Sequence, residues 1–155
     1  MKKLFAIDTN LLVYSHHLEA KYHQSAKAWL ERIMNERDEQ GNLSVCLPAQ
    51  VLMEFVKVIT WQQLKQPLSL SEAKRVVQDY VDTGIRIIYQ RDTHIETFLS
   101  LLGVVKSRKQ IFDVSLAAVL KDHGIAGLYT VDVTDFEIFD FLEVINPLST
   151  EGGVR

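Results

Sequence analysis

The chain lacks the features of a secreted or membrane-spanning protein. It has one cysteine, Cys46, so it can form no intrachain disulfide, and a reducing compartment is expected. No apolar run approaches the roughly 18 residues that cross a bilayer. The apolar run at residues 4–7 is too short for the core of a signal peptide, which needs about 7–15 residues. We therefore expect a soluble, cytoplasmic protein.

The sequence also lacks an excess of positive charge and a glycine-rich phosphate loop. Lys and Arg number 17 against 20 Asp and Glu, which gives a net charge of −3, so a nucleic-acid partner would need a local basic patch. The 7 glycines are scattered, which argues against a nucleotide site of the P-loop or Rossmann kind.

Length and patterning indicate one α/β domain. Of the 155 residues, 47% are hydrophobic and 24% are charged, which is typical of a soluble globular protein. We expect a single domain over residues 1–148 and a flexible tail over 149–155. Short apolar runs predict strands at 4–7, 44–47, 85–89, 128–131 and 142–145, and three- and four-residue spacings predict helices over 23–40, 48–61, 71–83, 93–105 and 112–123. Helices between strands imply a mainly parallel sheet covered on both sides, a three-layer α/β/α sandwich.

Acidic residues interrupt apolar segments at four places. Asp8 and Asp132 each end a predicted strand, whereas Glu54 and Asp113 lie within apolar helical stretches. Burying one unpaired carboxylate costs several kcal/mol, so four in one small domain require compensating positive charge. In parallel sheets, sites form beyond the carboxyl ends of the strands, and clustered oxygen ligands favour Mg²⁺ or Mn²⁺ over zinc.

Each acid also has a purely structural interpretation. Asp8 could cap a helix that starts at Asn10, and Asp113 could stabilise the N-terminus of its helix. Glu54 could pair with Lys57, and Asp132 could be an ordinary turn residue. One shared site explains all four acids more economically than four separate roles.

Together these segments resemble the PIN-domain nucleases, and among them the VapC-type toxins of bacterial toxin–antitoxin pairs. The resemblance spans nearly the whole chain. It rests on Asp8 followed by Thr9-Asn10, on the mid-chain Glu54, on Asp113 at the start of an apolar helix, and on the Thr-x-Asp-x-x-Asp-Phe segment over residues 130–136. It implies a PIN-like fold and a metal-dependent endoribonuclease using Mg²⁺ or Mn²⁺ that leaves 5′-phosphate and 3′-hydroxyl ends.

The resemblance also implies roles for individual residues. Asp8 and Asp113 would bind the metal directly, while Glu54 and Asp132 would bind it through water or position the attacking water. Residues expected to orient these ligands or the waters are Thr130 and Asn10. Asp135 either helps the metal site or serves as a cap or turn residue, and the second role is favoured.

Expected partners are RNA, a small antitoxin that covers the acidic site, and a second copy of the chain in a homodimer. The basic residues Lys106, Arg108 and Lys109 could hold the RNA backbone, although a helix C-terminus favours basic residues whatever the function. The helices near Trp29 and Trp61 are the expected groove for the antitoxin.

Two other functions stay open. A PIN-like domain can be a binding module for RNA or protein that cleaves nothing. A phosphatase of the haloacid dehalogenase type also has an Asp after its first strand, but its motif requires a second Asp two positions later, where this chain has Asn10.

Overall fold

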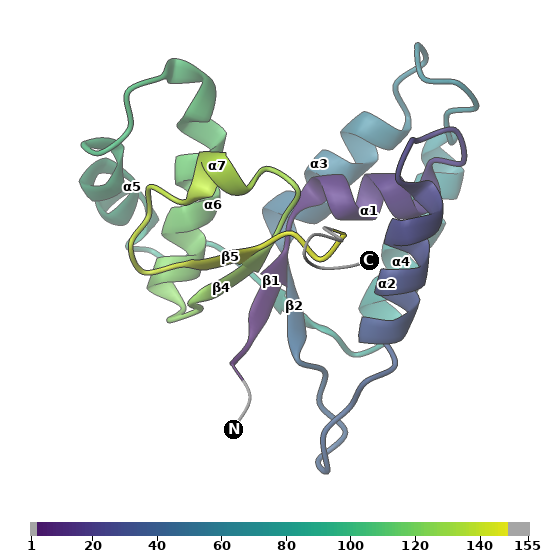
Figure 1. Cartoon of the computed structure of the whole chain (residues 1–155), viewed down its shortest axis with the longest axis horizontal. Coiled ribbons are helices and arrows are strands. Elements are labelled where there is room, and N and C mark those ends of the chain that lie inside the picture. Colours follow the sequence, from purple (N-terminus) through teal and green to yellow (C-terminus); the bar gives the residue numbers. More distant parts are fainter. Residues whose placement is uncertain (1–2, 149–155) are drawn as a thin grey trace.

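Five parallel strands form one sheet in the computed structural model, which describes residues 3–148 (Figure 1). The strands are β1 (Phe5–Ile7), β2 (Val45–Pro48), β3 (Arg86–Ile88), β4 (Gly127–Tyr129) and β5 (Glu143–Ile145). Their order in the sheet is β3-β2-β1-β4-β5, and every pairing is parallel. The five predicted strands are therefore confirmed, and the tail predicted over 149–155 lies outside the described residues.

Helices cover both faces of this sheet. They are α1 (Thr9–His16), α2 (His23–Ile33), α3 (Ala49–Ile59), α4 (Leu70–Asp82), α5 (His94–Leu102), α6 (Ile111–Asp122) and α7 (Val133–Phe136), with a 3-10 turn η1 (Arg108–Gln110) before α6. None of the helices described over 3–148 is long and apolar enough to span a membrane.

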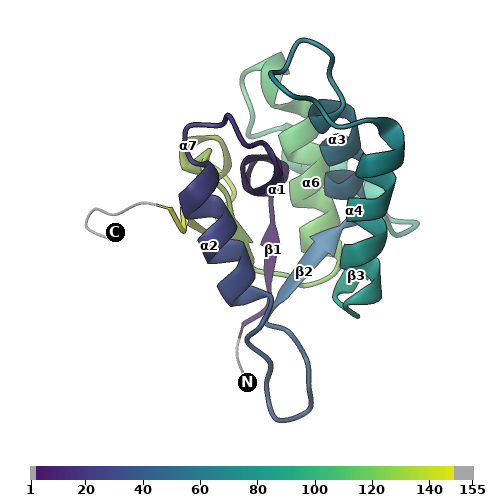
Figure 2. The same ribbon diagram turned by 90° about the vertical axis from the view of Figure 1, so that its right-hand side faces the viewer.

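The direction in which the chain passes from strand to strand decides which face of the sheet each connecting helix covers. The chain moves from β1 to β3 toward one edge, and then returns through β4 to β5 at the other edge. Because crossovers between parallel strands are right-handed, α1–α4 lie on one face and α5–α7 on the opposite face (Figures 1 and 2). The predicted three-layer sandwich is thus confirmed.

Burial on both faces explains the composition of the central strands. Every residue of β1 and β2 is buried, as expected for strands with helices above and below. The rings of Phe5 in β1 and Tyr129 in β4 stack with centroids 4.5 Å apart. The stacking adds to the pairing of β1 with β4, the two neighbouring strands that Asp8 and Asp132 follow.

One predicted helix boundary is wrong. The helix predicted over 23–40 ends at Ile33, because the apolar periodicity stops there and the next turn forms local bonds instead. The Asp38 carboxylate accepts backbone N–H bonds from Gln40 and Asn42, both at 2.9 Å. Arg37 then pairs with Leu43 in an isolated antiparallel bridge. A short polar side chain that bonds its own backbone competes with helix in this way.

A close approach between β1 and β4 requires glycine at position 127. A Cβ at Gly127 would lie 2.7 Å from the Phe5 ring, which is below van der Waals contact. We expect Gly127→Ala to lower the free energy of unfolding by about 1–3 kcal/mol, the range for overpacking a core. Urea unfolding would measure the loss. Gly103→Ala is the control, because its Cβ meets only the Ser100 carbonyl at 3.8 Å; an equal loss in both variants would contradict the prediction.

Candidate active site

The reversal of strand order places the site. β1 and β4 are neighbours, yet the connections that leave them run to opposite faces, which opens a crevice beyond their carboxyl ends. Asp8 directly follows β1, and Asp132 follows β4 by three residues. Both acids therefore reach the same edge of the sheet from adjacent strands.

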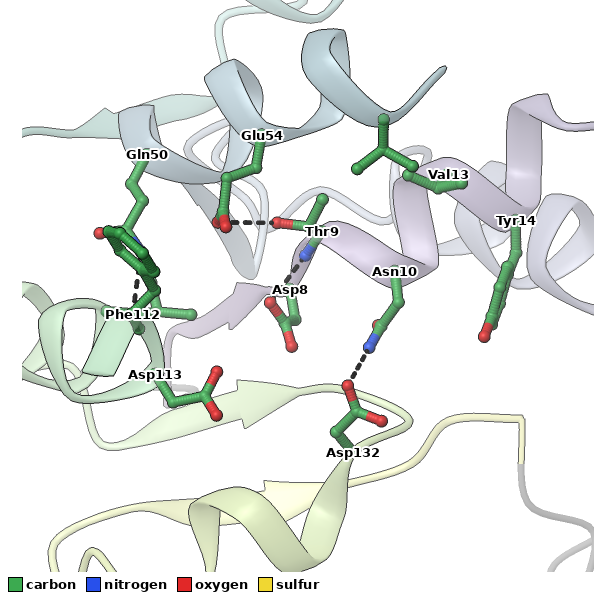
Figure 3. A pocket seen from close by; sticks show the side chains of 12 residues that line it. Asp8, Thr9, Asn10, Val13, Tyr14, Gln50, Glu54, Phe112, Asp113 and Asp132 are labelled. Atoms are coloured by element: carbon green, nitrogen blue, oxygen red, sulfur yellow. Dashed lines mark hydrogen bonds between the residues drawn. The ribbon is translucent and has the colours of Figure 1, made fainter. Parts of the chain in front are cut away.

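A pocket of about 350 Å³ lies at this edge (Figure 3). All four acids singled out from the sequence line it, one from each of four separate segments. Its lining consists of Asp8, Thr9, Asn10, Val13, Tyr14, Gln50, Glu54, Val58, Phe112, Asp113, Leu116 and Asp132. The lining contains no Lys, Arg or His among the described residues.

Asp8 is held in place by two hydrogen bonds. Its Oδ1 accepts the backbone N–H of Thr9 at 2.8 Å, which makes Asp8 the N-cap of α1. Its Oδ2 accepts the Thr130 hydroxyl at 2.7 Å. The predicted capping role and a place in the acidic pocket are thus compatible, because each carboxylate oxygen has its own partner.

Thr130 and Asn10 connect the ends of β1 and β4. The fully buried Thr130 hydroxyl accepts the backbone N–H of Asp132 at 3.0 Å while it donates to Asp8. The Asn10 amide donates to Asp132 Oδ2 at 3.0 Å. Its own Oδ1 is buried and has no hydrogen-bond partner in the described structure, so an oxygen ligand stands unused beside the acids.

Glu54 and Asp113 enter the pocket from opposite helical layers. Glu54 of α3 accepts the Thr9 hydroxyl at 3.3 Å. It forms no ion pair with Lys57 within residues 3–148, so the simple pairing considered from the sequence is not found. Asp113 lies in the first turn of α6 and points toward Asp8 and Asp132 (Figure 3).

Burial and mutual repulsion disturb two of the acids. Burial raises the pKa of the Asp8 carboxyl from 3.8 to about 6, opposed by the hydrogen bonds from Thr130 and Thr9 and assisted by the charges of Asp132 and Glu54. Burial also raises the pKa of Asp113 to about 7, and the neighbouring charges, that of Asp8 first, add to the effect. The pocket therefore has a deficit of positive charge at neutral pH.

The donor set fits a hard divalent cation. Carboxylates, the unused Asn10 oxygen and the absence of basic residues from the described lining are what Mg²⁺ or Mn²⁺ requires. Within residues 3–148, no three acidic, histidine or cysteine side chains stand close enough to enclose an ion directly. Mg²⁺ is suited to such spacing, because it keeps several waters and binds through only one or two carboxylates.

Other predicted site residues lie outside the pocket lining. Asp135 is an exposed residue of α7, where its backbone N–H donates to the Asp132 carbonyl at 3.1 Å and its carbonyl accepts Gln110 Nε2 at 3.1 Å. The basic residues stand exposed just before Asp113: Lys106 in the preceding loop, Arg108 and Lys109 in η1.

Sequence reasoning missed some pocket residues. Gln50, Tyr14 and Phe112 line the pocket, but none of them interrupts its local pattern, so no signal marked them. Trp29, expected near an antitoxin groove, is a core residue: it is buried and its ring meets that of Tyr129 edge-on at 5.1 Å. The apolar face of α2, which carries Trp29, packs on the sheet, whereas the side chain of Trp61 is 54% exposed.

Comparisons with known proteins point in one direction, although no family model matches the chain. It is 26% identical over 151 residues to ribonuclease VapC24 of Mycobacterium tuberculosis, covering 96% of this chain and 100% of the relative. The structure of FitAB bound to an IR36 DNA fragment matches with a TM-score of 0.66 at 21% identity, over 95% of this chain and 97% of that one. Mycobacterium tuberculosis VapC20, a toxin that cleaves the sarcin–ricin loop, matches with a TM-score of 0.62 at 15% identity, over 87% and 95%. Both solved structures share this fold.

The raised pKa values of Asp8 and Asp113 predict how pH changes the stability of the metal-free protein. Both groups hold protons in the folded state that the unfolded chain releases above pH 3.8, so stability should fall as pH rises from about 4 to about 7. We expect Asp113→Asn to weaken this fall and to be more stable than the unaltered chain by roughly 1 kcal/mol at pH 7.5, after allowance for solvent screening.

Thermal unfolding in EDTA between pH 4.5 and 7.5 measures the effect. Asp140→Asn, at an exposed acid outside the pocket, is the control. An identical fall with pH in Asp113→Asn and the unaltered chain would contradict the prediction.

Proposed function

We propose that this chain, a PIN-domain protein of the VapC type, is a metal-dependent endoribonuclease and the toxin of a toxin–antitoxin pair. The observation that carries the proposal is the meeting of Asp8, Glu54, Asp113 and Asp132 in one pocket without a basic residue in its described lining. The ribonuclease VapC24 relative, aligned over 96% of this chain, supports the same activity.

The four acids have different proposed roles in binding the metal. Asp8 and Asp113 are proposed as direct ligands, as the family resemblance implies, and their raised pKa values indicate that both carboxylates lack compensating positive charge. Glu54 and Asp132 are proposed to bind through water or to position the attacking water. Thr130 and Asn10 orient Asp8 and Asp132 by the bonds described above.

Phosphodiester hydrolysis at this pocket would require a nucleophilic water, neutralisation of the phosphate charge and stabilisation of the leaving oxygen. A divalent cation, Mg²⁺ or Mn²⁺, supplies all three when bound. Hydrogen bonds hold the side chains of Asp8, Glu54 and Asp132, so these acids need little reorganisation when the substrate arrives. Asn10 replaces the second Asp of a haloacid dehalogenase-type motif and donates its amide to Asp132, which does not favour the phosphatase alternative.

Partners follow from the same family. Lys106, Arg108 and Lys109 are proposed to bind the RNA backbone, because they precede the pocket residues Phe112 and Asp113 closely along the chain. A small antitoxin is proposed to cover the acidic pocket, and the active unit is proposed to be a homodimer, as the family resemblance implies. An exposed aromatic side chain at the pocket, Phe112 with 71% exposure, suits such a cover.

Cleavage of total RNA by the purified protein tests the function. With Mg²⁺ or Mn²⁺ we expect discrete products, and with EDTA none. Asp8→Asn and Asp113→Asn should each lower the rate at least ~100-fold, because each removes one charge that holds the cation.

Asp140→Asn, which alters an acid outside the pocket lining, should cut as the unaltered chain does. Circular dichroism checks that each variant is folded. Cleavage that persists in EDTA, or in both well-folded pocket variants, would rule out the acid cluster as the site. A folded protein that binds RNA but cuts none would favour the binding module.

Neutralising the basic cluster tests how RNA is held. The triple variant Lys106→Ala, Arg108→Ala and Lys109→Ala should raise KM and reduce the slope of log affinity against log salt by roughly one unit per lost phosphate contact. A matched triple variant changes exposed basic residues on or beside α4, across the sheet, namely Lys65, Lys74 and Arg75. Equal effects in the two variants would show that the cluster has no special role.

A further inference from the structure

A hydrogen-bonded chain runs from a buried histidine to the edge of the pocket. His94 of α5 is 7% exposed, and its Nε2 lies 3.2 Å from Ser115 Oγ in α6. Ser115 donates its hydroxyl to Gln50 Oε1 of α3 at 3.1 Å. Gln50 in turn donates through Nε2 to the Phe112 carbonyl at 3.2 Å, as Figure 3 shows.

Hydrogen counting fixes the direction of this chain. The Ser115 hydroxyl has one proton and gives it to Gln50, so His94 must donate from Nε2. The other ring nitrogen of His94, Nδ1, is buried without a partner in the described structure. The histidine is thus oriented by a single bond, and that bond leads toward the pocket.

Gln50 bridges two layers that the sheet otherwise separates. α3 and α6 lie on opposite faces of the sheet, and each delivers one acid to the pocket. Gln50 precedes Glu54 by one helical turn, so both project from the same side of α3. Its bond to the Phe112 carbonyl holds the residue directly before Asp113. The Gln50 amide therefore ties the backbone that carries Asp113 to the helix that carries Glu54.

We propose that Gln50, oriented by Ser115 and His94, is a positioning residue that sets the separation of Glu54 and Asp113 for metal binding. This inference rests on the proposed metal-dependent function. Ser115 and His94 do not line the pocket, and the hydrogen-bonded path from them to it runs through Gln50. Partners that orient metal ligands typically change metal affinity or activity by about 10–100-fold when removed, and a more remote group should change them less.

Ser115→Ala tests the proposal, because it deletes one hydroxyl and leaves the pocket lining intact. Titration calorimetry with Mn²⁺ should show a dissociation constant weaker by about 3–10-fold, below the range for direct partners of ligands. The kcat for RNA should fall by a similar factor while KM stays unchanged. Ser115→Thr keeps the hydroxyl and should restore Mn²⁺ affinity.

Thr97→Val separates positioning from general stability. The Thr97 hydroxyl donates to Asp122, so this variant also loses a bond between α5 and α6, but away from the pocket. It should keep its Mn²⁺ affinity even where thermal unfolding shows a loss of stability. Unchanged affinity in Ser115→Ala, or equal weakening in Thr97→Val, would overturn the inference alone. Failure of the unaltered chain to bind Mn²⁺ would overturn the proposed metal-dependent function as well.

Discussion

The gathering of buried, mutually repelling carboxylates at one end of the sheet is the constraint on which the surrounding structure depends. Burial is the main reason that the pKa values of Asp8 and Asp113 are raised, and the charges of the neighbouring acids raise them further. Hydrogen bonds from Thr9 and Thr130 lower the cost at Asp8 without removing it. A fold that keeps such groups together in the absence of a cation must anchor the segments that carry them, and the buried strand β1 anchors Asp8.

Topology explains why the acids meet although they are far apart in sequence. The strand order reverses between β1 and β4, so the chain leaves these neighbours toward opposite faces. Asp8 and Asp132 project into the gap that results, and the helices on either side add Glu54 and Asp113. Thr130 joins the two strand ends through one hydroxyl. The acidic cluster is therefore a consequence of the connection pattern and of a few local bonds.

The features that the sequence predicted well are those with a local signature. The position of Asp8 and Asp132 after apolar runs, and of Glu54 and Asp113 within apolar helical stretches, marked these four acids as candidates for one pocket. The central strands β1 and β2 were predictable for the same reason, since burial on both faces demands continuous apolar residues. The end of α2 at Ile33 was missed although the apolar periodicity stops there, because the bonds that Asp38 accepts from the backbone of Gln40 and Asn42 have no sequence period of their own.

Contacts between layers had no local signature. Gln50, Ser115 and His94 each look ordinary in their own helices, and their alignment depends on where α3, α5 and α6 cross the sheet. Trp29 illustrates the converse, because an aromatic residue on an amphipathic helix reads the same whether its face meets the core or a partner. The structure decides for the core by the contact with Tyr129.

Charge distribution shows how an acidic protein could act on the RNA substrate that we propose. The net charge of −3 gives no general attraction for a polyanion, and the pocket itself would repel a phosphate until positive charge enters it. Under the proposed function, attraction would come from two local sources, a cation among the acids and the basic residues just before Asp113. The same deficit would attract a basic side chain of an antitoxin, which the family resemblance implies. Metal and antitoxin would thus satisfy one electrostatic demand in alternative ways, so the features that enable catalysis would also make the pocket easy to block.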